Sequence, residues 1–327
     1  MGIKNLYKLI SDYSPNSITN KKISNYGNKI VVIDASLVIY QYVIAIRSTG
    51  KDLTNNNGDI TTHIHGIINK TMMLLKHNIM PVYVFDGKAP KLKGFTLKNR
   101  KNLKNKNIKK LEEEDYDNED DRIKIFKKCY TITKEHKIQI QEVLNLFGIP
   151  NFESTTEADT LCSLLVKKKL AYGCSTEDMD LLTFGCPILI RSLSQKKKAI
   201  EINLNQILKD FNMNQKQFID LCILLGSDYC PTIPRIGPKR AYEVIQKYKS
   251  IDNFLKNESE KYNIPENFNY IETRNYFMNK EIYDIKDIEM NKPNTSEIFS
   301  LLKNEYNFTN KKITDFIEKL NIFYESQ

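Results

Sequence analysis

Residues 29–34 read Lys-Ile-Val-Val-Ile-Asp, and residues 81–86 read Pro-Val-Tyr-Val-Phe-Asp. Both are short apolar runs rich in β-branched residues, a pattern typical of strands buried on both faces. Further candidate elements are strands over 171–177, 187–193 and 199–204 and helices over 62–77 and 156–170. Strands that alternate with helices predict an α/β fold with a mainly parallel central sheet flanked by helices.

The composition limits the class of protein. Lys and Arg number 49 against 40 Asp and Glu, which gives a net charge of +9 over 327 residues and permits a polyanionic partner. The most apolar stretch, residues 31–46, is too short and too polar to span a bilayer, so we expect no membrane association. The cysteines lack C-x-x-C spacing, which excludes a zinc ribbon and favours reduced thiols in an intracellular compartment.

The segment from Lys91 to Lys137 separates its charges into blocks. Residues 91–110 hold nine bases and no acid, residues 111–121 hold eight acids and no base, and residues 122–137 are basic again. We predict two helices joined at an acidic tip and inserted between two strands. Charge alone favours a solvated helical hairpin, and the alternative is a basic surface for a phosphate chain.

A second basic feature lies in the C-terminal third. The apolar run 218–225 leads into Gly-Ser-Asp-Tyr-Cys at 226–230, and Ile-Gly-Pro-Lys-Arg at 236–240 precedes a helical pattern over 241–247. This order predicts helix, tight turn, helix. Free N–H groups at the start of the second helix can hold a phosphate, and the helix dipole assists.

Acidic residues occur where acids are costly, at the ends of apolar strands and beside apolar helices. They are Asp34, Asp86, Glu157, Asp159, Asp178, Asp180 and Asp228. If the fold gathers them, two unit charges ~4 Å apart repel by about 4 kcal/mol at an effective dielectric near 20. Divalent cations would remove that cost, and hard oxygen ligands suit Mg²⁺ or Mn²⁺ rather than zinc.

Each acid also has a purely structural explanation. Ser154-x-x-Glu157 fits a capping box, and Ser175-x-x-Asp178 nearly does. Asp34 and Asp86 could each cap a helix that follows a strand, and Asp228 could cap the turn. The number of acids and their placement at strand ends favour chemistry, but sequence spacing does not show that they converge.

The motifs together resemble a known family. They are MGIKNLYKLI, VVIDASLVIYQ, YVFDGKAPKLK, EADT, STEDMDLLTFG, CILLGSDYC and IGPKRA, in this order from Met1 to about Leu320. This arrangement is similar to that of the flap structure-specific endonucleases of the XPG-type nuclease family. The resemblance implies a PIN-like α/β nuclease core with a helical arch and a helix-two-turn-helix motif.

The resemblance also implies a division of the chain and a reaction. The expected regions are an N-terminal nuclease region over 1–105, an arch over 91–137, an internal nuclease region over 138–260 with the helix-two-turn-helix at 216–248, and a C-terminal helical segment over 261–327 that packs on the core. The implied reaction is Mg²⁺-dependent hydrolysis of DNA phosphodiesters at 5′ flaps, in replication and repair, with 5′-3′ exonuclease activity.

The family pattern assigns roles to individual residues. The seven acids would hold two Mg²⁺ ions, for which Mn²⁺ can substitute, and Lys93 and Arg100 would contact the scissile phosphate. Tyr40 would stack on a neighbouring base, although a Tyr in an apolar run is more often core, and Arg47 lies where a 3′ flap is accommodated. The duplex backbone would contact a K⁺ site at the turn and Gly237, Lys239 and Arg240.

Some positions depart from that pattern. Asp159 stands where these enzymes usually carry Glu, and its side chain is one methylene shorter, as in the exonuclease branch. Arg235 replaces a Gly that usually precedes Ile236-Gly237, so the turn is expected to differ or to gain a phosphate contact. Residues 55–57 are Asn-Asn-Asn where an acidic patch often blocks the 3′-flap pocket.

The partners expected from the resemblance are branched DNA with a 5′ flap and a sliding clamp (PCNA). The resemblance also implies a monomeric protein located in the nucleus. Residues 317–324 keep the aliphatic and aromatic positions of a clamp-binding motif but lack its Gln. An apolar stripe on the last helix explains them better. Two other functions remain open, a processive 5′ exonuclease of the same superfamily and a non-catalytic DNA-junction binder.

Overall fold

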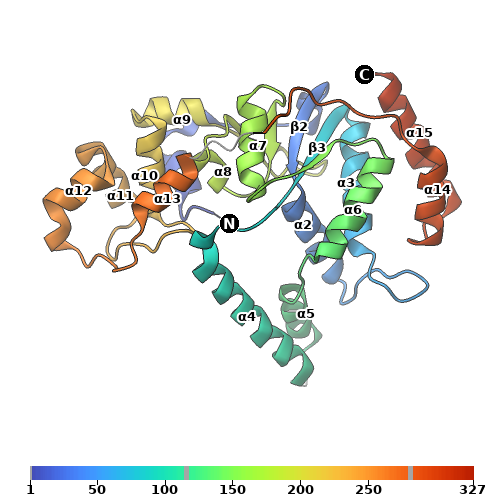
Figure 1. Cartoon of the computed structure of the whole chain (residues 1–327), viewed down its shortest axis with the longest axis horizontal. Coiled ribbons are helices and arrows are strands. Elements are labelled where there is room, and N and C mark those ends of the chain that lie inside the picture. Colours follow the sequence, from blue (N-terminus) through green and yellow to red (C-terminus); the bar gives the residue numbers. More distant parts are fainter. Residues whose placement is uncertain (1, 114–117, 279–282) are drawn as a thin grey trace. The chain divides into compact units, whose positions relative to one another are not determined.

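The computed structural model describes residues 2–113, 118–278 and 283–327 (Figure 1). The chain divides into two units built from interleaved segments: a first unit of residues 1–23, 88–96 and 156–284 and a second unit of residues 24–87, 97–155 and 285–327. Three acids of the expected tip, Glu114, Asp115 and Asp117, lie outside the described residues, as do Met1 and residues 279–282.

In the second unit the two apolar runs form neighbouring parallel strands. β2 (Lys29–Asp34) pairs with β3 (Ile79–Phe85), and β4 (Asn151–Glu153) pairs in parallel with the other edge of β3. All residues of β3 are buried, as its unbroken apolar sequence requires. The helices of this unit are α2 (Ala35–Arg47), α3 (Thr62–Lys76), α5 (Glu119–Lys128), α6 (Lys134–Leu146), α14 (Thr295–Asn304) and α15 (Asn310–Glu325).

In the first unit β5 (Gly173–Ser175) lies parallel to β6 (Ile188–Arg191), β7 (Ala199–Asn203) runs antiparallel to β6, and β1 (Ile18–Lys21) runs antiparallel to β7. The helices are α1 (Leu6–Tyr13), α7 (Ala158–Lys167), α8 (Asp180–Thr183), α9 (Leu204–Phe211), α10 (Gln215–Leu225), α11 (Pro238–Tyr248), α12 (Ile251–Glu258) and α13 (Tyr270–Met278). Helix α10 packs against both α11 and α13, which Figure 1 draws in yellow to orange.

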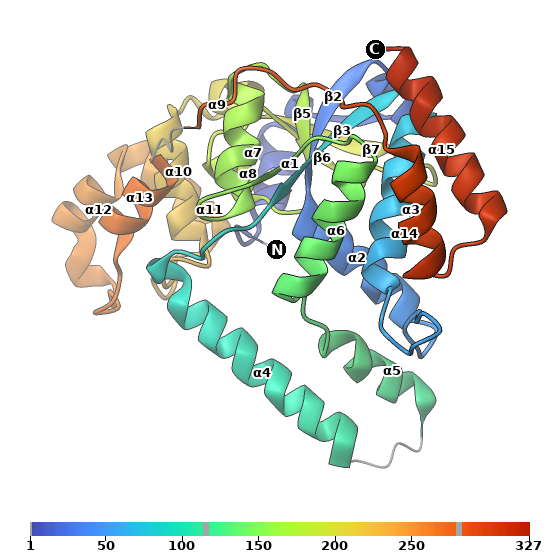
Figure 2. The same ribbon diagram turned by 45° about the vertical axis from the view of Figure 1, so that its right-hand side comes forward.

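The charged segment forms helices, as predicted. The turn η3 (Lys91–Lys93) leads into α4 (Gly94–Glu113), and α5 follows the tip (Figure 2). No residue of α4 is buried, which agrees with its mostly polar sequence, although Phe95 and Leu103 are left 74% and 62% exposed. Helix α5 contacts α2 within the second unit. Both a solvated hairpin and a phosphate-binding surface are compatible with this exposure.

The expected strands at 29–34, 81–86, 171–177, 187–193 and 199–204 are all present within a few residues. The strands β1 and β4 were not expected, because Ile-Thr-Asn-Lys and Asn-Phe-Glu are too short and too polar to stand out. None of the described helices has the length and apolar composition to cross a bilayer.

The C-terminal segment confirms the apolar-stripe interpretation. The buried residues of α15 are Ile313, Phe316, Leu320 and Phe323, spaced three or four apart, and α15 packs against α14 and α3. Ile322 is 68% exposed, whereas Leu320 and Phe323 are buried. Of the positions assigned to clamp binding, Leu320 and Phe323 are therefore engaged in the core of the second unit, whereas Tyr324 is 36% exposed.

Candidate active site

Five of the seven predicted acids lie in the first unit and interact with one ammonium group. The Nζ atom of Lys93, at the end of η3, bonds Glu157 Oε1 and lies 3.9 Å from Asp228 Oδ2. It also interacts electrostatically with the remaining three acids. We call these five residues, Glu157, Asp159, Asp178, Asp180 and Asp228, the acid cluster.

Glu157 is held by side chains rather than by a helix end. It occupies the N-cap position of α7, yet its side chain makes no capping bond. Its Oε2 atom accepts hydrogen bonds from the Tyr229 hydroxyl at 2.6 Å and the Tyr276 hydroxyl at 3.0 Å, while Oε1 faces Lys93. The capping-box alternative for Ser154 and Glu157 is therefore wrong.

Asp178 and Asp180 follow β5 on the turn that opens α8. The Asp180 amide donates to Asp178 Oδ1 at 3.1 Å, so the turn brings the two carboxylates together. Burial, followed by the like charge of Asp178, raises the pKa of Asp180 well above its usual range, and burial also raises the pKa of Asp178. A buried carboxylate and a half-buried one that repel each other indicate a site that needs positive charge.

Gly2 lies directly against the carboxylates of Asp178 and Asp180. A Cβ atom at Gly2 would lie 2.0 Å from Asp178 Oδ1 and 2.7 Å from Asp180 Oδ1. With φ at +83°, the residue also has a left-handed backbone that favours glycine. Any side chain at position 2 would displace the two carboxylates.

The other two acids lie in the second unit, at the carboxyl ends of adjacent parallel strands. Asp34 ends β2 and Asp86 follows β3. The Oδ1 atom of Asp34 accepts from the Leu37 amide at 3.1 Å, so the helix-cap interpretation of Asp34 is confirmed. Asp86 has no helix directly after it to cap, and its carbonyl accepts from Lys137 at 2.8 Å.

The donor set of the acid cluster fits a hard divalent cation. All its side-chain donors are carboxylate oxygens, and the buried Oδ1 of Asp180 receives no hydrogen bond from any residue that the structure describes. Within those same residues no group of three or more His, Cys, Asp or Glu is already arranged as a metal cage. The positive charge next to Glu157 is supplied instead by the Lys93 ammonium.

The predicted DNA contacts have different surroundings. Arg100 lies exposed on α4, and Tyr40, on α2, is 37% exposed and therefore not a core residue. Arg47 is buried within the second unit: its guanidinium bonds Asp52 through Nε at 2.9 Å and Nη2 at 2.7 Å and donates to the Phe126 carbonyl at 3.1 Å. A 3′-flap contact by Arg47 would require these bonds to break.

The turn before α11 keeps its expected residues at the surface. Gly237 is the N-cap of α11, and a Cβ there would meet no atom within 4 Å, so the helix start is open to a ligand. Lys239 is exposed, whereas Arg240 bonds Tyr262 at 3.0 Å and Glu258 at 3.3 Å. Arg235 has φ of +69°, the left-handed conformation in which glycine is favoured.

Sequence reasoning missed Gly2, Tyr229 and Tyr276 as parts of the site. Tyr229 directly follows Asp228, so its position beside an acid was a usable signal, whereas Gly2 stands in the motif MGIKNLYKLI, which contains no acid. Tyr276 lies 119 positions from Glu157 in an ordinary helical sequence, and nothing local marks it. Its role becomes visible only when α13 is folded against α10.

Two family models match the chain and define its class. The XPG N-terminal domain matches residues 1–107, and the XPG I-region matches residues 148–228. Together they include Lys93, the two strand-end acids of the second unit and the whole acid cluster. The chain therefore carries both regions of an XPG-type nuclease.

Similar proteins narrow the class to a family. Flap endonuclease 1 of Entamoeba dispar is 41% identical over 98% of this chain and 87% of its own length, and flap endonuclease 1 of Homo sapiens is 39% identical over the same shares. The solved flap endonuclease-1 from Methanococcus jannaschii has a TM-score of 0.74 at 28% identity, with 97% of this chain and 98% of that one covered. The chain belongs to the flap endonuclease family, whose members are structure-specific nucleases.

The fold prediction is confirmed by the same comparison. The catalytic core of Rad2 in complex with DNA substrate also matches, with a TM-score of 0.74 at 23% identity over 98% of this chain and all of that one, a likeness that concerns the fold alone. The architecture is a mixed α/β nuclease core with a central sheet flanked by helices. For a nuclease of this family a divalent metal cofactor is implied.

Proposed function

We propose that this protein is a structure-specific 5′-flap endonuclease with 5′-3′ exonuclease activity, which hydrolyses DNA phosphodiesters near the junction of single and double strands. The observation that carries the proposal is the gathering of five carboxylates around Lys93 in the first unit. Family membership supports the substrate, since the relatives are named for flap cleavage and one solved relative is bound to DNA substrate.

The proposed cofactor is a pair of Mg²⁺ ions, replaceable by Mn²⁺, held by the acid cluster together with Asp34 and Asp86. When bound, such ions supply a nucleophilic water and stabilise the leaving oxygen. The chain contributes the oxygen ligands and their alignment: Tyr229 and Tyr276 fix Glu157, and the Asp180 amide fixes Asp178. A K⁺ ion at the turn before Gly237 is part of the same proposal.

Cationic and aromatic side chains would bind and orient the DNA. Burial alone would lower the pKa of the Lys93 ammonium, but Glu157, Asp159 and Asp228 together raise it above its usual value. Lys93 therefore stays protonated, and its ammonium could leave Glu157 to bind a phosphate. Arg100 would contact the same phosphate, Tyr40 would stack on a base, and Gly237 with Lys239 and Arg240 would hold the duplex backbone. Arg47 would reach a 3′ flap only after leaving Asp52.

Three further assignments are proposed with the activity. The partner is branched DNA bound by a monomer, and the nucleus is the compartment in which replication and repair would supply it in a eukaryotic cell. Clamp binding through residues 317–324 is the weakest of the three, because Leu320 and Phe323 are buried. A clamp pull-down that Phe323→Ala does not weaken would dispose of it.

The test is cleavage of end-labelled double-flap, nicked and blunt duplex DNA with Mg²⁺ and with EDTA. We expect Mg²⁺-dependent cutting at the flap junction by the wild type, and loss of cutting with retained DNA binding for Asp178→Asn. Equal rates on all three substrates would favour the processive exonuclease. No cutting with either Mg²⁺ or Mn²⁺ would favour the junction binder, although a pure binder gains nothing from acids placed near phosphates.

A further inference from the structure

Two phenol groups from different parts of the chain donate to the same oxygen of one acid. The Tyr229 hydroxyl lies 2.6 Å from Glu157 Oε2, and the Tyr276 hydroxyl lies 3.0 Å from the same atom. A tyrosine hydroxyl is protonated at neutral pH and a carboxylate oxygen only accepts, so both phenols act as donors. The lone pairs of Oε2 are thereby used, while Oε1 faces Lys93.

The two phenols are themselves held rigidly. Helix α13 carries Tyr276, and Thr273 on the same helix donates to the Tyr229 carbonyl at 3.3 Å. The rings of Tyr229 and Tyr276 lie 5.1 Å apart, and Tyr276 meets the ring of Phe184 edge-on at 5.6 Å. Phe184 is the C-cap of α8, whose first residue is Asp180, so Tyr276 on α13 contacts Glu157 directly and also packs on the helix that carries Asp180.

We propose that Tyr276, together with Tyr229, is a positioning residue that fixes Glu157 so that only Oε1 is presented to a divalent cation. The inference rests on the proposed function, since it concerns the metal that the acid cluster would hold. Because Oε2 already accepts two hydrogen bonds, Glu157 would bind the cation through Oε1 alone. Oε1 is the atom that Lys93 contacts in this structure. Tyr276 contacts neither DNA nor metal and acts through the carboxylate.

Hydrogen bonds of this kind orient metal ligands, and their loss can be measured as a change in metal affinity. Losing a partner that bonds a ligating side chain typically costs ten- to a hundred-fold in metal affinity or activity. Tyr276→Phe removes one hydroxyl and keeps the ring that packs on Phe184 and Tyr229. The variant therefore separates the hydrogen bond from the packing of α13.

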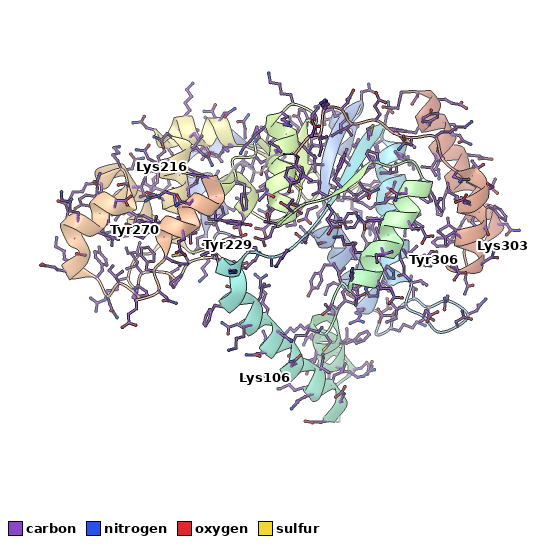
Figure 3. All side chains as sticks on the ribbon, viewed as in Figure 1. Lys106, Lys216, Tyr229, Tyr270, Lys303 and Tyr306 are labelled. Atoms are coloured by element: carbon purple, nitrogen blue, oxygen red, sulfur yellow. The ribbon has the colours of Figure 1, made fainter. Side chains whose placement is uncertain are left out.

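The chain offers a matched control on the same helix. Tyr270, which Figure 3 labels apart from Tyr229, donates its hydroxyl to Asp252 Oδ1 at 3.1 Å. Tyr270→Phe therefore also removes a phenol–carboxylate bond from α13 but keeps both phenol bonds to Glu157. Any general loosening of α13 should appear in both variants. A change confined to Tyr276→Phe reports on Glu157.

The experiment measures the Mn²⁺ dissociation constant of the DNA-free chain by electron paramagnetic resonance, and the Mg²⁺ concentration for half-maximal flap cleavage. For Tyr276→Phe we expect both to rise about tenfold, with the thermal midpoint and the DNA dissociation constant unchanged, and we expect wild-type values for Tyr270→Phe. Unchanged metal constants in Tyr276→Phe would overturn the proposal, as would an equal shift in Tyr270→Phe.

Failure here is distinguishable from failure of the proposed function. If Glu157→Gln cleaves flaps with the wild-type Mg²⁺ dependence, Glu157 is no metal ligand and the proposed function loses that residue. If Glu157→Gln loses metal and cleavage while Tyr276→Phe behaves as wild type, the flap endonuclease proposal stands and only the positioning role of Tyr276 is refuted.

Discussion

The first unit contains two groups of charges, each with buried members, that are built in opposite ways. In one, Arg274 bonds Asp220 through Nε at 2.5 Å and Nη2 at 2.8 Å and reaches Asp252 at 2.7 Å, and Asp220 also accepts the Ile251 amide. We call Asp220, Asp252 and Arg274 the anchor cluster. In the acid cluster, by contrast, five carboxylates share the ammonium of Lys93.

The difference separates a structural network from a functional one. The anchor cluster pairs its buried charges in a fork geometry and joins α10 to α13, so its bonds serve the fold. The acid cluster has a surplus of negative charge and a buried Asp180 oxygen that receives no hydrogen bond from the described part of the chain. A folded protein tolerates such a surplus where a ligand completes it.

The largest effect is expected when the anchor cluster is broken. Arg274→Met removes the cation and leaves Asp220 buried without its main partner. Breaking a buried pair in this way typically costs about 3–5 kcal/mol. We expect a loss of that size in the free energy of unfolding measured in urea, and a loss below about 1 kcal/mol would show that the cluster behaves as a surface pair.

A third buried group, in the second unit, is kept uncharged and sharpens the contrast. His63 on α3 stacks on His136 at 4.3 Å and bonds Gln139 at 2.7 Å, with His65 nearby. Burial, followed by the charge of His136, lowers the pKa of His63 to about 4 from 6.5. The unfolded chain therefore binds more protons between these pH values, so stability is complete above pH 6.5 and is lost as the pH falls toward 4.

The expected size of that loss is about 3 kcal/mol for His63, at about 1.4 kcal/mol per pKa unit. We expect the unfolding free energy of His63→Gln to depend less steeply on pH across this window than that of the wild type, whatever its value at pH 7. Some slope should remain, because burial also lowers the pKa of His65 to about 4. Equal pH slopes in the two proteins would mean that His63 takes up a proton as readily in the folded state as in the unfolded chain.

Removing one surplus charge should have a moderate effect of opposite sign. Asp180→Asn is expected to stabilise the metal-free protein by about 1–2 kcal/mol, a fraction of the ~4 kcal/mol that like charges ~4 Å apart cost at an effective dielectric near 20. Added Mg²⁺ should raise the thermal midpoint of the wild type more than that of the variant. A metal-free variant that is less stable than the wild type would show that Asp180 serves the fold.

The smallest effect is expected from backbone strain at Arg235, a residue of the first unit that belongs to neither the anchor cluster nor the acid cluster. Arg235 is exposed with φ of +69°, so Arg235→Gly should stabilise the chain by about 1 kcal/mol. The thermal response to Mg²⁺ should match that of the wild type, which makes this variant the control for Asp180→Asn. A weaker affinity for duplex DNA would indicate that the Arg235 side chain also contacts phosphate.

The sequence predicted those parts of the molecule that depend on local pattern. The run 29–34 became β2 without change of bounds, and Asp34 caps α2 as one of its two interpretations required. The polar strands β1 and β4 were not predicted, because they form through pairing with a neighbouring strand and their own residues carry no strand pattern.

For the same reason the sequence predicted the acids of the site but not the contacts that hold them. The acids were found because charge at a strand end is unusual, but their relation to Lys93 is a matter of tertiary packing. Tyr276 lies 119 residues from Glu157 along the chain, and the Phe126 carbonyl lies 79 residues from Arg47. Capping explained Glu157 equally well until the fold showed its oxygens bonded to Tyr229 and Lys93.

The most direct test of the account is a crystal structure of this chain grown with Mn²⁺, examined for anomalous scattering. The account predicts Mn²⁺ peaks among Glu157, Asp178, Asp180 and Asp228, with the Lys93 ammonium displaced from Glu157, and no peak at Asp220. An acid cluster without Mn²⁺ and with Lys93 still bound to Glu157 would contradict it.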